Sequence, residues 1–336
     1  MKISNFSRYA LGIILTAAAF AGCSGSQAIA PSATQLSNVI PTQGRGGSWM
    51  RSGTSEDLLY VSDSGSNSVY VYSFPDGTLA GTLTGLNNPQ GDCVDASQNV
   101  WIANAGANDT IEYAHGGTSP LATLHDPGKY PPFACAIDPT TGNLAITNAE
   151  PPYGRGEVMI YRNAQGTPRA YKVSSVPHLY YDGYDNQGNL FVDGITGNFG
   201  HRHHEPNAAF AELAKHSKSF VGIPLYGGAF FARPGGVQWD GKYITVVNVN
   251  VVYEIKISGG HGNVVGSTTP SGTYDSEVLA TAISGSYLAA STSNPSSGGW
   301  GVGIWKYPSG KSGGTLQGTF TAVHGVAVSL ASTKNP

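Results

Sequence analysis

The sequence predicts an all-β fold in which six units of four short strands close into a ring. Gly supplies 46 and Pro 20 of the 336 residues while only 12% are charged, which is typical of short strands joined by tight turns. A strand-like segment recurs six times with its last residue at 63, 104, 148, 194, 248 and 291, so the steps are 41, 44, 46, 54 and 43 residues. Periods of about 40–50 residues with several strands each are typical of the blades of a β-propeller.

The first 22 residues have the features of a bacterial export signal. Lys2 and Arg8 give a basic start, residues 9–20 form an apolar core, and small residues follow. Such a core is too short for a stable transmembrane helix. Residues 20–23, Phe-Ala-Gly-Cys, resemble the bacterial lipobox, and the resemblance implies that Cys23 is lipidated and becomes the first mature residue. The alternative is an A-x-A cleavage site at residues 19–21, which would release a soluble protein.

Residues 23–57 are rich in Ser, Gly, Gln, Ala, Pro and Thr without an apolar period, so we expect a flexible tether. With Cys23 lipidated, the domain would be anchored in the bacterial cell envelope, at the outer membrane or the periplasmic face. In the alternative it is secreted and soluble. A net charge of −3 provides no electrostatic basis for binding nucleic acid, and we expect a monomer.

Each unit contains four expected strands in a fixed order. The first-type strands end at the six positions given above, and a second strand follows each of them, at residues 69–74, 110–113, 158–161, 209–212, 251–255 and 302–307. A shorter third strand follows, as at 78–83 and 120–124, and a fourth precedes the next unit, at 91–95, 134–138, 181–185 and 236–240. Residues 208–218 have some helical spacing, but the repeat register predicts a strand there.

The chain ends one strand short of completing its last unit. Residues 324–329 are a fourth-type strand, but no partner strand follows before Pro336. The missing partner is present at the other end of the sequence, at residues 58–61. We therefore predict a ring over residues 58–332, closed by pairing of the C-terminal strand with the first blade and followed by a tail at 333–336. Closure leaves only short, protected edges.

The unit resembles the NHL-type six-bladed propellers, whose pattern runs roughly as G-V-A-V-D, turn, L-Y-V-A-D, loop, V-x-V-Y. Here residues 325–328 are Gly-Val-Ala-Val, 58–63 are Leu-Leu-Tyr-Val-Ser-Asp, and 69–72 are Val-Tyr-Val-Tyr. The resemblance covers about residues 58–330. It implies an architecture but no single activity, because this fold hosts binding modules, lactonases and lyases.

Asp or Asn ends the first-type strand in four of the six units, namely Asp63, Asn104, Asn148 and Asn248. Each side chain is expected to cap its own loop by hydrogen bonding to backbone N–H groups. The alternative is that they form a polar, ligand-binding ring at one mouth of the central channel.

The channel mouth can be sampled by counting back five residues from the end of each fourth-type strand. This gives Gln90, Phe133, Tyr180, Gly235, Leu279 and His324. We expect a ligand or partner site lined by Gln90, Phe133, Tyr180 and His324, because aromatic side chains provide large contact areas with a polar handle.

Two families of similar fold imply an enzymatic alternative. Gluconolactonase-like propellers bind a divalent metal through carboxylate and amide ligands, but the corresponding positions here do not form a carboxylate-rich ring. Streptogramin-lyase-like propellers use His and Glu near a metal, and His178, Glu277 and His324 could imitate that set. The alternative function is therefore a metal-dependent hydrolase or lyase with its site at the channel mouth.

Two further groups are candidate sites. The fourth unit carries about ten extra residues that include His201, His203, His204 and Glu205, which could bind zinc or a similar ion or could lie in a solvated loop. Cys93 and Cys135 occupy the same strand type in neighbouring units, so they are either a disulfide, which export permits, or two buried thiols.

No nucleophile elbow, phosphate loop or dinucleotide fingerprint occurs in the sequence. No cofactor is assured, and a divalent metal is the one candidate. The sequence therefore favours an exported scaffold that binds a protein, a glycan or a small molecule.

Overall fold

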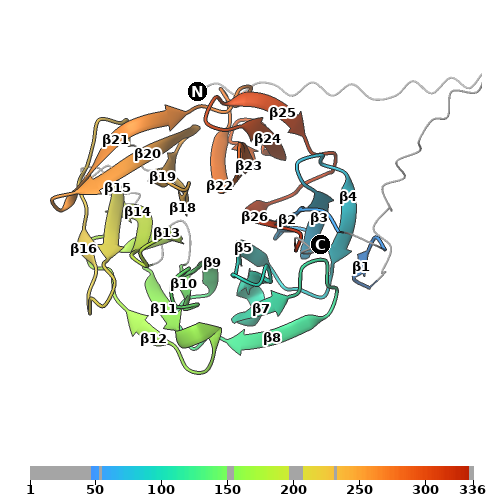
Figure 1. The fold of residues 1–336 in the computed structure, drawn as a ribbon, viewed down its shortest axis with the longest axis horizontal. Helices are drawn as coiled ribbons and strands as arrows, with labels where there is room; N and C mark the ends of the chain where they lie inside the picture. Colours follow the sequence, from blue (N-terminus) through green and yellow to red (C-terminus); the bar gives the residue numbers. More distant parts are fainter. Residues whose placement is uncertain (1–46, 53–54, 150–154, 197–206, 231–232, 333–336) are drawn as a thin grey trace, which may run out of the picture. The chain divides into compact units, whose positions relative to one another are not determined.

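The computed structural model describes residues 47–52, 55–149, 155–196, 207–230 and 233–332. All of these residues belong to one compact unit, Gln43–Pro336. Its described residues form six antiparallel-rich sheets arranged around a central axis (Figure 1). The unit is a six-bladed β-propeller, as the repeat register predicts.

Blades 1 to 3 form the first half of the ring, and the C-terminal strand is the inner strand of blade 1. Blade 1 has the order β1-β4-β3-β2-β26, blade 2 runs β5 to β8, and blade 3 runs from inner β9 to outer β12. Their strands are β1 (Trp49–Met50), β2 (Leu58–Asp63), β3 (Ser68–Ser73), β4 (Leu79–Leu83), β5 (Pro89–Val94), β6 (Val100–Asn104), β7 (Asp109–Tyr113), β8 (Pro120–His125), β9 (Pro132–Ile137), β10 (Leu144–Asn148), β11 (Glu157–Tyr161), β12 (Arg169–Tyr171) and β26 (Val323–Ser329).

Blades 4 to 6 complete the ring. Blade 4 runs β13 to β16, blade 5 has the order β17-β21-β20-β19-β18, and blade 6 runs β22 to β25. Their strands are β13 (His178–Tyr184), β14 (Leu190–Thr196), β15 (Asn207–Leu213), β16 (Val221–Gly222), β17 (Leu225–Tyr226), β18 (Pro234–Trp239), β19 (Ile244–Asn248), β20 (Val251–Ser258), β21 (His261–Thr268), β22 (Glu277–Ser284), β23 (Tyr287–Asn294), β24 (Gly299–Lys306) and β25 (Lys311–Thr315). Single-turn 3₁₀ segments, η1 (Ala105–Ala107) and η2 (Arg162–Ala164), follow β6 and β11.

Counted outward from the channel, the second strand of each blade is the first-type strand of the sequence repeat. These strands are largely buried, which explains the low charge of the chain. Every residue of β2, β6, β10 and β19 is buried, because each of these strands has a neighbour on both sides and a blade against each face. The outer β25 is exposed along its whole length. Of the segment with helical spacing, residues 208–213 belong to the strand β15 (Asn207–Leu213), which pairs with β14 throughout. Residues 214–218 form a turn instead, so the repeat register predicted the strand correctly but extended it too far.

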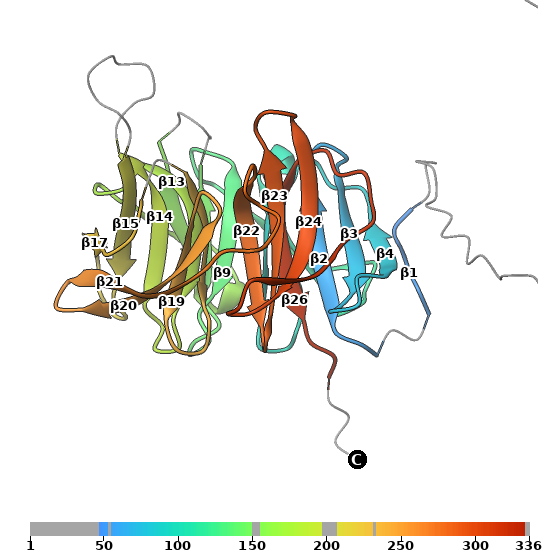
Figure 2. The ribbon, with the colours of Figure 1, turned by 90° about the horizontal axis from the view of Figure 1, so that it is seen from above.

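Closure of the ring is confirmed. β26 pairs antiparallel with β2, from Leu58 opposite Ser329 to Asp63 opposite Val323, and each of the six inner strands contacts the next around the ring. Figure 2 shows β26 beside β2 and β22, where the last strand joins the first blade. Glycine makes this contact possible at Gly91, where a Cβ atom would lie 2.7 Å from the Cα atom of Ala134 in the next blade.

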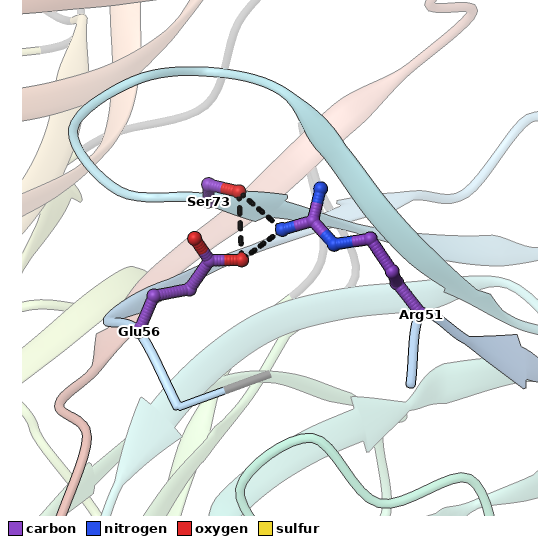
Figure 3. A network of polar contacts seen from close by, with 3 residues as sticks. All are labelled: Arg51, Glu56 and Ser73. Atoms are coloured by element: carbon purple, nitrogen blue, oxygen red, sulfur yellow. Dashed lines mark hydrogen bonds and ion pairs between the residues drawn. The ribbon is translucent and has the colours of Figure 1, made fainter. Parts of the chain in front are cut away.

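The segment before β2 is tied to the outer part of blade 1 by a small polar network (Figure 3). The Arg51 guanidinium forms an ion pair with Glu56 and donates a hydrogen bond to Ser73 Oγ at 3.1 Å. Ser73 Oγ in turn donates to Glu56 Oε1 at 3.0 Å. The short β1 pairs with β4 nearby, so blade 1 gains a fifth strand from the N-terminal side.

A disulfide joins blades 2 and 3. Cys93 on β5 and Cys135 on β9 are bonded, with their Cα atoms 5.6 Å apart. Of the two states that the sequence leaves open, the structure therefore has the bridge. Within the described residues, no helix is long and apolar enough to cross a membrane.

Candidate functional site

All six inner strands carry a β-bulge near the start of their pairing with the second strand. Pairing skips two residues in blades 2, 4, 5 and 6 and one residue in blades 1 and 3. The skipped residues include all six of those that the sequence places at the channel mouth: Gln90, Phe133, Tyr180, Gly235, Leu279 and His324. A bulge changes the direction of the side chains that it carries. The side chains at this position therefore point in a different direction from those in the regularly paired part of each strand.

The aromatic residues of these bulges meet with Trp300 in one group, here called the aromatic cluster: Phe133, Tyr180, Tyr181, Trp300 and His324. The Phe133 ring lies 5.9 Å from Tyr180, 5.4 Å from Tyr181 and 6.1 Å from His324 between centroids. Trp300, from β24, lies 5.1 Å from His324 in an edge-to-face arrangement. Phe133, Tyr180 and His324, expected together from the sequence, are therefore neighbours contributed by blades 3, 4 and 1.

His324 is a neutral member of this cluster. Burial lowers the pKa of its imidazole to about 4, although the carboxylate of Asp63 acts in the opposite direction. Its Nδ1 atom lies 3.3 Å from Ser64 Oγ. At neutral pH the ring is uncharged, which fits its packing between Phe133 and Trp300.

A cavity of about 370 Å³ lies inside the ring, lined by all six inner strands. The lining residues are 91–94 of β5, 134–137 and 139 at β9, 181–186 at β13, 236–239 of β18, 280–282 of β22 and 324–328 of β26. Pro139 and Asn186, in the turns that follow β9 and β13, are exposed, so the cavity reaches solvent at this face, here called the turn face. Toward the opposite end its lining includes His324 and Tyr181 but neither Phe133 nor Tyr180.

Three polar residues occupy equivalent positions in the cavity wall. Asp92, Asp182 and Thr281 are each the residue at which pairing resumes after the bulge, and all three line the cavity. Asp182 is only 5% exposed, and neither of its carboxylate oxygens has a hydrogen-bond partner outside its own residue. Asp92 Oδ2 and Thr281 Oγ1 are also buried without a partner.

Burial changes the protonation of both carboxyl groups. It raises the pKa of Asp92 to about 7, against the hydrogen bond that Asp92 Oδ1 accepts from Ser62 Oγ at 2.6 Å. It raises the pKa of Asp182 well above its usual range. Asp193, on the neighbouring β14, also has a raised pKa because of burial, and the charge of Asp182 adds to this effect. Perturbed carboxyl groups in a concave site are a common feature of functional sites.

The polar residues that end the second strands support loops. Asp63 is fully buried and accepts hydrogen bonds from the backbone of Gly65, Thr321 and Ala322. Asn104 Oδ1 accepts from the backbone of Asn87 at 2.6 Å, and its amide donates to Asp109.

Asn148 and Asn248 lie at the same position in blades 3 and 5. The Asn148 amide donates to the carbonyl of Tyr130 at 2.6 Å, and Asn248 is 2% exposed. Gln90, at the bulge of β5, donates to Asn88 Oδ1 at 2.8 Å. None of Asp63, Asn104, Asn148, Asn248 and Gln90 is among the residues that line the cavity.

The residues of the enzymatic alternative have other surroundings. Glu277 forms an ion pair with Arg233 at 2.8 Å, and His178 is buried at the start of β13. In the part of the chain that the structure describes, no three His, Cys, Asp or Glu side chains are grouped so as to hold a metal ion. His201, His203, His204, Glu205 and Cys23 lie outside the described residues.

Sequence reasoning did not single out Asp92, Asp182, Thr281 or Trp300. Each of the first three comes directly after its bulge, two residues beyond the counted position (Gln90, Tyr180 or Leu279), so the count does not select it. Trp300 lies on β24, two strands away from the channel, and nothing in its local sequence marks it as a neighbour of His324.

No protein-family model matches the chain, and no curated protein matches it. Solved structures do. A chain in a nidogen/laminin complex is 14% identical over 82% of this chain and 99% of that one, with a TM-score of 0.60. A protein of unknown function from Bacteroides caccae is 11% identical over 81% and 98%, with a TM-score of 0.58. A functionally unknown protein from Desulfotomaculum acetoxidans is 14% identical over 81% and 98%, with a TM-score of 0.53. These similarities establish the fold alone.

Proposed function

We propose that this chain is a binding protein that takes up a small molecule in the central cavity of an NHL-like propeller. The observation that carries the proposal is a cavity of about 370 Å³ lined by all six blades. That volume is within the range of about 300–1,000 Å³ typical of small-molecule sites. The wall combines apolar and polar residues, which is the usual composition of a specific pocket.

The geometry favours binding over metal-dependent catalysis. Glu277 is engaged by Arg233, and among the described residues no cluster suited to a metal ion occurs. The lactonase-like or lyase-like alternative therefore receives no support from the arrangement of His178, Glu277 and His324.

A blocking variant tests the cavity. Asn186 is exposed and lines the opening at the turn face, whereas the next residue, Gln187, is exposed without lining the cavity. We expect small molecules from a screening library that raise the melting temperature of the wild type to do so for Gln187→Trp and to fail for Asn186→Trp. A ligand present at about 100 times its Kd would stabilise the fold by roughly 2.7 kcal/mol. Hits that bind Asn186→Trp as well as the wild type would place the site elsewhere, and a screen without hits would count against a small-molecule cavity.

We further propose that the protein is exported and held in the bacterial cell envelope by lipid on Cys23. The lipobox-like Phe-Ala-Gly-Cys sequence at residues 20–23 supports this, and two or more acyl chains suffice for stable anchoring. Cys23→Ser should move the protein from the membrane fraction to the soluble fraction. Retention in the membrane fraction would contradict lipidation.

A further inference from the structure

The inner strands present a backbone edge to the central cavity. Among the described residues, each of β5, β9, β13, β18, β22 and β26 ends its sheet and pairs on one side only, and Figure 1 shows these six strands innermost in the ring. Successive side chains of a strand point to opposite faces of its sheet, which here are the faces toward the two neighbouring blades. The unpaired edge, with its row of N–H and C=O groups, therefore faces the axis of the ring.

Glycines show that backbone atoms form part of the cavity wall. Four lining residues are glycines from four different inner strands: Gly91, Gly183, Gly236 and Gly325. Because glycine has no side chain, each of them contributes only backbone to the wall. A Cβ atom added at any of the four would collide with the inner strand of a neighbouring blade, which agrees with side chains that point between blades. The wall therefore offers peptide groups, which are both donors and acceptors.

The acidic side chains of the wall are packed between blades. Asp92 Oδ1 accepts from Ser62 Oγ at 2.6 Å, and a Cβ atom added at Gly325 would lie 2.8 Å from Asp92 Oδ2, so this carboxyl packs against blade 1. The other Asp92 oxygen and both oxygens of Asp182 are buried. Burial raises the pKa of both groups, to about 7 for Asp92, because it favours the uncharged form.

The wall holds no free charge that would select an ion. Among the described residues that line the cavity there is no Lys, Arg or Glu, and burial lowers the pKa of His324 to about 4. Asp185 lines the cavity, but its oxygens accept from the backbone of Gln187 and from the backbone and side chain of Asn189. An ion would lose its hydration here without gaining a counter-charge, which is costly. An uncharged ligand avoids that cost.

Two aromatic rings lie near the opening at the turn face. Tyr184 and Trp239 are the last residues of β13 and β18, and both line the cavity and are partly exposed. Such rings provide large apolar contact areas. The cavity thus combines apolar ring faces with peptide groups from several sides. A ring compound that carries several hydroxyl groups matches both, because each hydroxyl can donate and accept.

We propose that the central cavity binds an uncharged sugar, whose hydroxyl groups exchange hydrogen bonds with the peptide groups of the inner strands and whose C–H face packs against Tyr184 and Trp239. This inference rests on the proposed function, because it names the ligand class of the same cavity.

Sugars that share a ring but differ in charge test the ligand class by calorimetry on the full-length protein. Glucose, galactose and mannose are each compared with the 2-amino sugar and the 6-carboxylate. We expect at least one neutral sugar to bind, and its two charged counterparts to bind at least roughly tenfold more weakly, because the wall supplies no counter-charge. The 2-deoxy sugar is the control, since it loses a hydroxyl without gaining a charge, and it should bind better than the 2-amino sugar.

A further probe tests the hydrogen bonds. Tetrahydropyran-2-methanol keeps the ring oxygen and one hydroxyl of a hexose, so it should bind far more weakly than the sugar. An equal affinity would show that the peptide edges take no part in binding and would overturn the inference.

Two substitutions at one position test the aromatic contact. Trp239→Leu should weaken binding of the neutral sugar by roughly two- to tenfold, and Trp239→Phe, which keeps a ring, should weaken it less. Trp49→Leu is the matched control, because Trp49 lies on the outer β1 of blade 1 and does not line the cavity, so the affinity should stay unchanged. Melting curves confirm that each variant folds.

The outcomes separate the two proposals. No binding of any of the three neutral sugars, tighter binding of a charged counterpart, or sugar binding indifferent to Trp239→Leu would overturn the sugar inference. In each of these cases library hits that are lost in Asn186→Trp would still support a small-molecule cavity. Failure of the proposed function itself would instead appear as ligands, sugars included, that bind Asn186→Trp as well as the wild type.

Discussion

Blades 1 and 3 have the same strand order from the channel outward but are assembled in different ways. In blade 3 the inner β9 and its partner β10 are consecutive in sequence, and Asp138 closes the turn between them by accepting from Thr140 and Thr141. In blade 1 the inner β26 comes from the other end of the chain, so no turn joins it to β2. Other contacts must therefore hold β26 against β2 in place of a connecting turn.

Side chains replace it. The backbone N–H of Ala331 donates to Asp57 at 2.8 Å, and that of Leu330 donates to the Gln98 side chain at 2.7 Å. Ser329 Oγ donates to the carbonyl of Gln98 at 2.7 Å and lies 2.7 Å from His115 Nδ1. At the other end of β26, Asp63 accepts from Thr321 and Ala322. Closure is thus held at the start of β26 by Asp63 of blade 1 and at its end by Asp57 of blade 1 together with Gln98 and His115 of blade 2.

The largest effect should follow from removing the closing strand. Deleting residues 323–336 removes β26, leaves β2 with an unpaired edge and opens the ring. We expect loss of cooperative thermal unfolding, measured by circular dichroism and calorimetry. Deleting only residues 333–336 is the control, since β26 ends at Ser329, and it should leave the melting transition in place. An unchanged transition in the longer deletion would refute closure by this strand.

The disulfide gives blades 2 and 3 a covalent link that the closure at blade 1 lacks. Cys93 and Cys135 are 42 residues apart, and closing a loop of that length contributes roughly 4 kcal/mol in the chain-entropy model. The double variant Cys93→Ser, Cys135→Ser should lose about that amount in urea unfolding. The wild type in reducing agent should behave in the same way. A loss below about 1 kcal/mol would show that the inner strands of these blades are held without it.

The sequence repeat predicts most of the fold, but it does not decide whether Cys93 and Cys135 form a disulfide. The reason is their position within the repeat. Cys93 and Cys135 differ by one residue in their distance from the following Asp95 and Asp138. That offset places their side chains on opposite faces of their sheets, and opposite faces of neighbouring blades are the ones that face each other. A feature that looks like a mismatch in sequence is what brings the two sulfurs together.

The site was predicted in part. Counting from the strand ends selected Phe133, Tyr180 and His324, because the six bulges occupy one register position. It could not select Asp182 or Asp92, since a carboxyl on an inner strand has the same sequence signature whether or not its oxygens are satisfied. That distinction depends on Ser62 lying opposite Asp92, which only the packing of blade 1 against blade 2 determines.

Asp63 and Asn148 occupy the same position in blades 1 and 3, which allows a matched test. Asp63 accepts from three backbone N–H groups and from Thr321 Oγ1, whereas Asn148 donates to Tyr130 and interacts with Asp126. Asp63→Ala leaves several buried donors without a partner and should cost roughly 3 kcal/mol, against about 1 kcal/mol for Asn148→Ala. Chemical unfolding of the two variants measures the difference. Equal losses would mean that Asp63 has no special part in closure.

The smallest expected effect concerns Asp92, which bridges blades 1 and 2 through Ser62. Burial raises its pKa to about 7, above the value of about 3.9 in an unfolded chain. The folded state therefore binds a proton that the unfolded state has released, so stability is highest below about pH 4 with respect to this group and falls as the pH rises toward 7. Because the side chain retains some exposure, we expect a fall of roughly 1 kcal/mol between about pH 5 and pH 7. Asp92→Asn should remove that part of the slope, while Asp95→Asn, in the exposed turn, should retain it. An identical pH dependence in wild type and Asp92→Asn would show that this carboxyl stays ionised at the junction of the two blades.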